Sequence, residues 1–243
     1  MATHLATSFY QQGFEIVQVF SKTLENATKL SQTTNAKPIN SLNLLNNEAD
    51  FYIICIKDDA INEVLQRIIF KGKIIAHTSG SIPIDVFKTN SYQNYGIFYP
   101  LQTFSKEKAI NLKEVPFCIE GNNNDTENQL FEMAIHLSDH VHFVSSEQRK
   151  KLHLAAVFAC NFTNYMYTIA NDITSKNDIN FDILKPLIKE TANKIMENNP
   201  ATMQTGPAIR KDTAVINNHL EMLSDDKDYQ AIYKLVSDSI SNQ

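Results

Sequence analysis

The pattern of apolar and polar positions changes near residue 145 of this 243-residue chain. Before that point short apolar runs alternate with amphipathic stretches, and the near-continuous apolar run at 49–56 is typical of a parallel strand buried on both faces. Further strands are predicted at 15–20, 37–39, 73–77, 95–99, 115–120 and 141–144. Strands that alternate with helices predict an α/β fold with a mostly parallel, doubly wound sheet.

Helices are expected between these strands, at 24–32, from Asp58 or Asp59 to Gly72, and at 126–137. Thr23 is a plausible cap for the first of them. The chain also opens in a helical pattern, because Leu5 and Phe9 share an apolar face and Gly13 can stop the helix.

One long helix is predicted over 145–173, where Ser145 and Gln148 have the spacing of a capping box. Its middle is apolar on every side, which predicts a buried helix. At 100° per residue four polar side chains fall on one line, and Asn161 lies about 80° to the side. The four are His153, Cys160, Asn164 and Asn171. This stripe either faces a cleft or consists of core or dimer-interface groups with satisfied hydrogen bonds.

Beyond this helix the apolar positions keep helical spacing to the end of the chain. Pro186 is tolerable if Asp182 caps the next helix, because the proline then falls in the opening turn, and Asn199-Pro200 ends that helix. Two more helices follow the Gly206-Pro207 break. We therefore expect two domains, 1–144 with the sheet and 145–243 with helices alone.

Composition excludes several classes of protein. The net charge of -5 gives no general attraction to nucleic acid or to an anionic membrane. Cys55, Cys118 and Cys160 lie in apolar runs without CxxC spacing, so we expect buried free thiols, a reducing compartment and no metal site. The apolar runs are shorter than a membrane span, and no signal pattern opens the chain, so a cytoplasmic protein is expected.

Polar residues follow the predicted strands, and a doubly wound domain binds its ligand at the carboxyl ends of its strands. Ser21-Lys22-Thr23 follows the first strand, where a protein that selects NAD usually has an acidic residue. A lysine and two hydroxyls suit the 2′-phosphate of NADP, although they also suit a solvated turn with a helix cap. Lys57-Asp58 after the next strand fits either a cofactor site or a cap. Thr78-Ser79-Gly80 is either a plain turn or a place where Gly80 lets a planar ring approach the backbone.

A dinucleotide-binding domain usually begins with a strand and a GxGxxG turn, and this sequence has neither. Either the α/β arrangement is a different one, or the chain as given lacks its first strand. Loss of that strand would expose a sheet edge on both of its neighbours and remove the pyrophosphate cradle. In-frame codons upstream of Met1 would then encode the strand and the turn.

Several segments, in order, resemble the Rossmann-like family with a C-terminal domain of unknown function 2520, a relative of pyrroline-5-carboxylate reductase and of the 6-phosphogluconate dehydrogenase group. The segments are ATHLA, VFSKTLENA, ADFYIICIKDDAI, HTSGSIP, GIFYPLQTFS, HLAAVFACNFTN, TGPAIRKD and HLEML. The resemblance covers nearly the whole chain, and family members carry a GxGN-like turn just before the segment that matches ATHLA. It implies an NADP-binding Rossmann-like domain and a helical domain that usually forms a homodimer.

The resemblance also implies site residues. His153 and Asn161 are the catalytic candidates, and Asn164 is the competing amide. The cofactor would lie against Ile56 and the three polar segments already named. Tyr99, Gln102 and Arg210 would bind substrate. Arg210 is either the partner of a carboxylate, because its planar fork binds one bidentately, or an exposed arginine at the start of a helix.

The expected function is that of an NADP-dependent oxidoreductase for a small carboxylate-bearing molecule, with His153 as general acid or base. The alternatives are an inactive truncated member and a dimeric nucleotide-binding or sensing protein without turnover. The absent glycine-rich turn favours the second of these alternatives.

Overall fold

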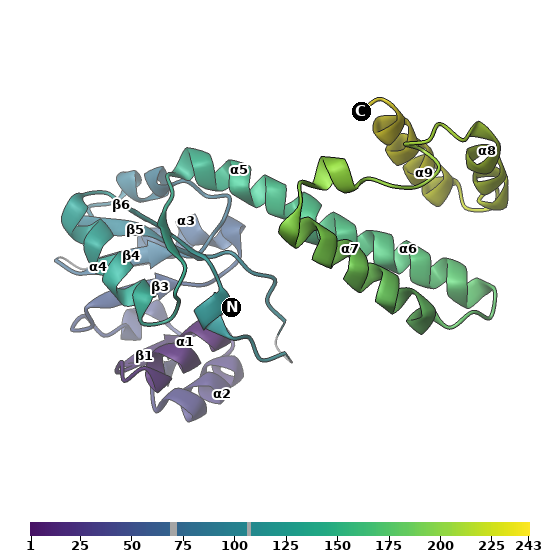
Figure 1. The fold of residues 1–243 in the computed structure, drawn as a ribbon. Helices are drawn as coiled ribbons and strands as arrows, with labels where there is room; N and C mark the ends of the chain where they lie inside the picture. Colours follow the sequence, from purple (N-terminus) through teal and green to yellow (C-terminus); the bar gives the residue numbers. More distant parts are fainter. Residues whose placement is uncertain (69–71, 106–107) are drawn as a thin grey trace. The chain divides into compact units, whose positions relative to one another are not determined.

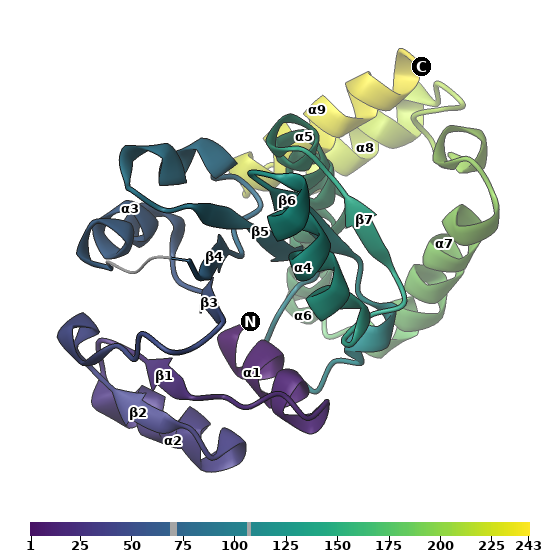
Figure 2. The ribbon, with the colours of Figure 1, turned by 90° about the vertical axis from the view of Figure 1, so that its left-hand side faces the viewer.

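The computed structural model describes residues 1–68, 72–105 and 108–243. Five strands form the main sheet in the order β3-β4-β5-β6-β7 (Figures 1 and 2). They are β3 (Phe51–Ile54), β4 (Ile74–His77), β5 (Asn94–Pro100), β6 (Phe117–Gly121) and β7 (Val141–Phe143). All neighbours are parallel except β5 and β6, which confirms the predicted α/β fold with a mostly parallel sheet.

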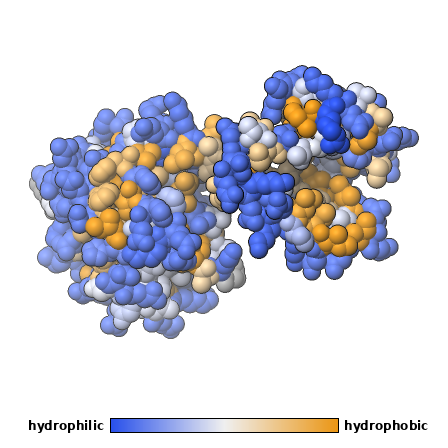
Figure 3. Space-filling view, viewed as in Figure 1, coloured by the Kyte–Doolittle hydropathy of each residue, from blue (hydrophilic) through white to orange (hydrophobic). Residues whose placement is uncertain are grey.

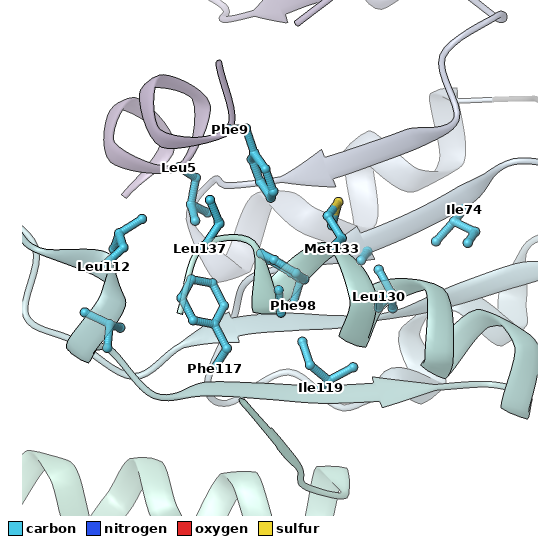
Figure 4. Close-up of a cluster of buried hydrophobic side chains, with 13 residues drawn as sticks. Leu5, Phe9, Ile74, Phe98, Leu112, Phe117, Ile119, Leu130, Met133 and Leu137 are labelled. Carbon is cyan, nitrogen blue, oxygen red and sulfur yellow. The ribbon is translucent and has the colours of Figure 1, made fainter. Parts of the chain in front are cut away.

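Two faces of this sheet are covered by different helices. Side chains of β4, β5 and β6 pack on one face against α1 (Ala2–Gln11) and α4 (Asn124–Ile135). Figure 4 shows the side chains of this cluster, with Leu5 and Phe9 of α1 facing the side chains of the sheet. The labelled members are Leu5, Phe9, Ile74, Phe98, Leu112, Phe117, Ile119, Leu130, Met133 and Leu137. On the other face, α3 (Asp58–Arg67) packs against Ile54 and Ile75. The alternation of Ile74 and Ile75 between the two clusters is the period of two that a strand imposes.

A second, two-stranded sheet consists of β1 (Gln18–Phe20) and β2 (Lys37–Ile39), with α2 (Leu24–Thr34) packed against them. Within the described residues β1 pairs with β2 alone and β3 with β4 alone, so each has one edge without a partner strand. The expected exposure of both edges is therefore present. It also corrects the prediction for 49–56: the strand is short, and Phe51, Tyr52 and Ile53 are only half-buried because a neighbour is present on one side of β3 only.

The predicted long helix is helical throughout but not uniform. Its start is confirmed, because Ser145 and Gln148 form the capping box that opens α5 (Ser146–Ala156). A π-helix, η4 (Val157–Phe162), follows and leads into α6 (Thr163–Lys176). The i→i+5 bonds of a π-helix change the angle between successive side chains. The predicted line from His153 through Cys160 to Asn164 therefore does not hold, since it assumed 100° per residue.

The predicted burial of this helix is also wrong in the single chain. Leu154 and Phe158 are 59% and 62% exposed, and Cys160 is exposed as well. Of the other two thiols, Cys118 is buried as expected and Cys55 is half-buried. Apolar side chains on every side of a helix show that its burial would be favourable, but they do not show that the same chain buries it.

The chain divides into two units, 1–160 and 161–243. The division falls inside the π-helix, within the segment that the sequence assigns to the helical domain. The second unit contains α6, α7 (Lys185–Glu197), α8 (Thr213–Met222) and α9 (Lys227–Ser241). Pro186 lies in the first turn of α7, as predicted. The predicted cap at Asp182 is wrong, because Leu184 is the N-cap of α7 and Asn180 caps the 3-10 turn that precedes that helix.

Short 3-10 helices complete the described chain. They lie at Leu42–Leu44, Ile84–Thr89, Leu112–Glu114, Phe181–Leu184 and Pro200–Met203. Across the described ranges, no helix combines the length and the apolar character needed to cross a membrane.

His77, the last residue of β4, is a titratable group inside the core. Its ring is fully buried and stacks on Phe87 with centroids 5.5 Å apart, and its Nδ1 accepts a bond from the Ser79 backbone N–H. Burial, helped by the positive charge of Arg149, lowers the pKa of His77 to about 4. In the unfolded chain His77 becomes protonated near pH 6.5, whereas in the folded chain it becomes protonated only near pH 4.

Stability contributed by neutral His77 is thus complete above pH 6.5 and lost as the pH falls towards 4, by an amount on the order of 3 kcal/mol. We expect His77→Asn, which keeps an acceptor on the side chain, to lose less stability between pH 7 and pH 4.5 than the parent. Urea unfolding at both pH values measures this. The exposed His140→Asn is the control and should keep the parent's dependence. Equal acid losses in all three proteins would contradict the assignment.

Candidate active site

Three polar segments follow strands: one follows β1 of the two-stranded sheet, and two follow the neighbouring parallel strands β3 and β4 of the main sheet. Parallel strands deliver their carboxyl ends to one edge of their sheet. After β4, Thr78, Ser79 and Gly80 form a buried turn. The Thr78 hydroxyl donates to the Ile54 carbonyl at the end of β3. The Ser79 hydroxyl accepts from the backbone N–H groups of Ser81 and Ile82 at 3.1 and 3.0 Å. The turn is thus held in one conformation by its own side chains.

Asp58 contributes to the same turn. The Ser81 hydroxyl donates to the Asp58 carboxylate, so Asp58 links the start of α3 to the turn after β4. Neither Lys57, which is the N-cap of α3, nor Asp58 makes the side-chain cap bond that the sequence suggested. Both side chains are exposed at this edge.

Gly80 lies directly against two aromatic rings. A Cβ built on Gly80 would lie 2.6 Å from Nδ1 of His153 and 2.9 Å from Cζ of Tyr99. The Tyr99 hydroxyl and Nδ1 of His153 are 3.1 Å apart and share a hydrogen bond. The missing side chain of Gly80 therefore makes room for His153 and Tyr99 of this chain.

Arg149 connects this cluster to the sheet, and the sequence analysis did not single it out. Its side chain is fully buried, and Nη1 donates to the Glu120 carboxylate at 2.8 Å. Its Nη2 donates to the Ile82 carbonyl of the turn at 2.6 Å. Ser146, one turn earlier on α5, also donates to Glu120 and accepts from the Ile84 N–H. The sequence offered one signal for this ion pair. Glu120 ends one predicted strand, and Arg149 lies in the helix that follows the next predicted strand.

The segment after β1 fits a phosphate group. Lys22 is 69% exposed and its Nζ lies 3.5 Å from the Glu63 carboxylate, a distance at which the ammonium remains available to a stronger anion. The Ser21 hydroxyl accepts from the Thr23 N–H, and Thr23, the N-cap of α2, makes no side-chain cap bond. An exposed ammonium, two hydroxyls and a helix N-terminus suit the 2′-phosphate of NADP.

The structure brings some of the predicted site residues together and leaves others apart. Tyr99, Gly80 and His153 are in contact, whereas Ile56 and Gln102 are exposed and do not join this cluster in the described contacts. Asn161, Asn164 and Arg210 belong to the C-terminal unit, where all three are exposed. Their roles stay predictions.

Comparison with known proteins identifies two family regions. Residues 115–240 match the domain of unknown function DUF2520, and residues 1–79 match the family described as NADP oxidoreductase, coenzyme F420-dependent. A search of curated proteins gave no match.

Solved structures cover the whole chain. A Bacteroides fragilis protein, predicted to be an NADP oxidoreductase, is 47% identical over 100% of this chain and 94% of its own, with a TM-score of 0.93. The imine reductase of Myxococcus stipitatus, solved with NADP⁺, is 14% identical over 100% of this chain and 89% of its own, with a TM-score of 0.66. The 1-pyrroline-5-carboxylate reductase of Streptococcus pyogenes is 13% identical over 98% and 94%, with a TM-score of 0.62. The last two show a shared fold.

The DUF2520 match spans more than half of the chain, and the Bacteroides relative is similar from end to end. Both observations agree with the α/β sheet, the helical C-terminal unit and the phosphate-compatible segment after β1. This confirms the family resemblance, the fold class and NADP as the cofactor of the family. The chain belongs to the DUF2520 family of NADP oxidoreductases with a Rossmann-like domain.

Proposed function

We propose that this chain is an NADP-dependent reductase or dehydrogenase of a small molecule that carries a carboxylate. The observation that carries the proposal is the position of His153. Its ring is held by Tyr99 against Gly80, in the turn after β4, at the edge where doubly wound sheets bind their ligands. An imidazole at such a place can act as a general acid or base toward a bound substrate.

The chain's own residues supply binding and orientation. Lys22, Ser21 and Thr23 would hold the 2′-phosphate, and bound NADPH would supply the hydride. Arg149 and Ser146 keep α5 fixed against the turn, so His153 need not be ordered when substrate arrives. Arg210 supports the carboxylate part of the proposal, because an exposed guanidinium binds carboxylates bidentately.

The reaction type can be tested with NADPH and a panel of compounds that contain C=O or C=N bonds. The Myxococcus imine reductase and the Streptococcus 1-pyrroline-5-carboxylate reductase are named for substrates that contain a C=N bond, which supports the choice of this panel. Each compound is tested with and without a carboxylate. NADPH oxidation restricted to the carboxylate-bearing members supports the proposal. NADPH binding without oxidation by any compound would favour the alternative, a nucleotide-binding protein without turnover.

His153 gives the sharpest test within that assay. His153→Gln should keep the melting temperature within a few degrees and lower the rate by about 10²–10⁴, because the change removes a proton donor from a partly exposed position. Single-turnover rates beside thermal melts separate this from a structural role. A variant that is destabilised by about 1–3 kcal/mol but fully active when folded would refute the catalytic role.

Lys22 tests the choice of cofactor. Lys22→Ala should weaken NADPH binding about ten- to a hundredfold and leave NADH binding nearly unchanged, since a bond to a charged group is worth about 1.5–3 kcal/mol. Calorimetric titration of both cofactors measures this. Lys29→Ala is the matched control, because Lys29 is also 69% exposed and pairs with Glu25 on the same helix. Equal losses for both cofactors would show that Lys22 does not bind the phosphate.

A homodimer formed through the C-terminal helices is part of the same proposal. Among residues 161–243 Ala208 is the only buried apolar residue, whereas Ile183, Leu187 and Met196 are 70%, 63% and 80% exposed. Figure 3 shows hydrophobic atoms at the surface of this unit, around α6 and α7. Monomeric proteins rarely expose large contiguous apolar patches. A second copy of the chain offers the same apolar helices as a cover.

We expect sedimentation equilibrium to give about twice the chain mass of 27.6 kDa. Leu187→Glu should shift the equilibrium to monomer, because it places a charge in the centre of the proposed interface. Lys189→Glu, an exposed change two residues away on α7, is the control and should leave the dimer intact. A parent protein that sediments as a monomer at micromolar concentration would disprove this part.

A further inference from the structure

The two ring nitrogens of His153 have different surroundings. Nδ1 lies 3.1 Å from the Tyr99 hydroxyl, and the two rings meet edge to face at 73°. Within the described ranges Tyr99 has no other hydrogen-bond partner for its hydroxyl, and Nε2 of His153 has none at all. Nε2, at the opposite edge of the ring, is therefore the nitrogen left for a ligand.

The Tyr99 hydroxyl has to donate its hydrogen to Nδ1. Tyr99 is only 6% exposed, and burial raises its pKa to about 12, so the hydroxyl stays protonated at neutral pH. A buried hydroxyl without an acceptor costs about 1–3 kcal/mol. The lone pair of Nδ1 is the acceptor within reach, and an imidazole that accepts at Nδ1 carries its hydrogen on Nε2.

Protonation of the ring would not change this assignment. In an imidazolium both nitrogens carry hydrogens, so Nδ1–H would donate to the Tyr99 oxygen and Nε2 would still be a donor. With Tyr99 in place, Nε2 therefore presents a hydrogen in both charge states of the ring.

Neighbouring groups keep the ring in this orientation. Gly80 lies so close to Nδ1 that a methyl group there would collide with the ring, which closes that side. Arg149 lies four residues before His153 on α5, and residues at this spacing share a helix face. Because Arg149 binds the Ile82 carbonyl at 2.6 Å, it fixes α5 to the turn that contains Gly80.

We propose that Tyr99 is a positioning residue that fixes His153 with its hydrogen on Nε2, so that His153 is a hydrogen-bond donor to the substrate. The ligand group that this arrangement suits is an acceptor with a free lone pair, such as the oxygen of a C=O bond or the nitrogen of a C=N bond. The inference about the substrate rests on the proposed function, whereas the position of the hydrogen does not. Tyr99, which the sequence suggested as a substrate ligand, then acts through His153.

NMR spectroscopy of protein with ¹⁵N-labelled histidine tests the position of the hydrogen directly. Two-bond ¹H–¹⁵N correlations distinguish the two neutral tautomers, and the signal absent from His153→Gln identifies His153. We expect the Nε2–H tautomer in the parent protein without any cofactor. A parent ring with its hydrogen on Nδ1 would overturn the proposal, even if no variant could be prepared.

Tyr99→Phe removes the hydroxyl and keeps the ring. In this variant we expect His153 to become a mixture of both tautomers. Tyr92→Phe is the matched control, because Tyr92 is also buried and its hydroxyl donates to the backbone carbonyls of Leu65 and Ile68. It should cost stability without changing the His153 signal. An unchanged tautomer in Tyr99→Phe, or an equal change in Tyr92→Phe, would overturn the role of Tyr99.

A kinetic measurement tests the functional consequence. With a substrate found in the NADPH assay, Tyr99→Phe should lower kcat about ten- to a hundredfold with little change in KM, because a misplaced catalytic group mainly slows the chemical step. A rise in KM alone would return Tyr99 to direct substrate binding and overturn the proposal. Failure of the parent to oxidise NADPH would count against the proposed function, while the tautomer would still decide the role of Tyr99.

Discussion

The ion pair between the fully buried Arg149 and the partly buried Glu120 is the interaction on which the candidate site depends. It joins the first turns of α5 to the end of β6, and the same guanidinium holds the Ile82 carbonyl beside the Gly80 turn. Removing one partner from a buried pair leaves the other charge without compensation and typically costs about 3–5 kcal/mol. Because Ser146 and His153 lie on the same helix, this pair also sets their positions.

The C-terminal unit has polar contacts between its helices but little buried apolar surface. Its helices are joined by polar contacts, such as the bond from the Tyr229 hydroxyl to Asp172 at 2.6 Å and the bond between His219 and Tyr233 at 2.8 Å. The hydrogen bond to the Asp172 carboxylate is the main reason that the pKa of Tyr229 rises to about 12. Polar contacts orient helices, but burial of apolar surface supplies most of the stability of a domain. In the single chain the helices of this unit leave much of their apolar surface exposed.

The candidate site residues lie in both units of the chain. The sheet unit contains the phosphate-compatible segment after β1 and the cluster of Tyr99, Gly80 and His153. The helical unit contains Asn161, Asn164 and Arg210, whose roles stay predictions. The π-helix between α5 and α6 lies where the two units meet in the sequence, and such segments occur frequently at functional sites.

The sequence by itself determined the elements whose signals are local. The strand at 37–39, the capping box at Ser145 and Gln148, the start of α1 and the place of Pro186 all follow from period, caps and backbone chemistry, which act within a few residues. Only the tertiary structure decided the features that depend on distant residues. These include the burial of Arg149 against Glu120, the contact of Gly80 with His153, and the half-buried state of β3. The physical reason is that burial and pairing depend on which surface covers a residue, and a pattern of apolar positions does not say which surface that is.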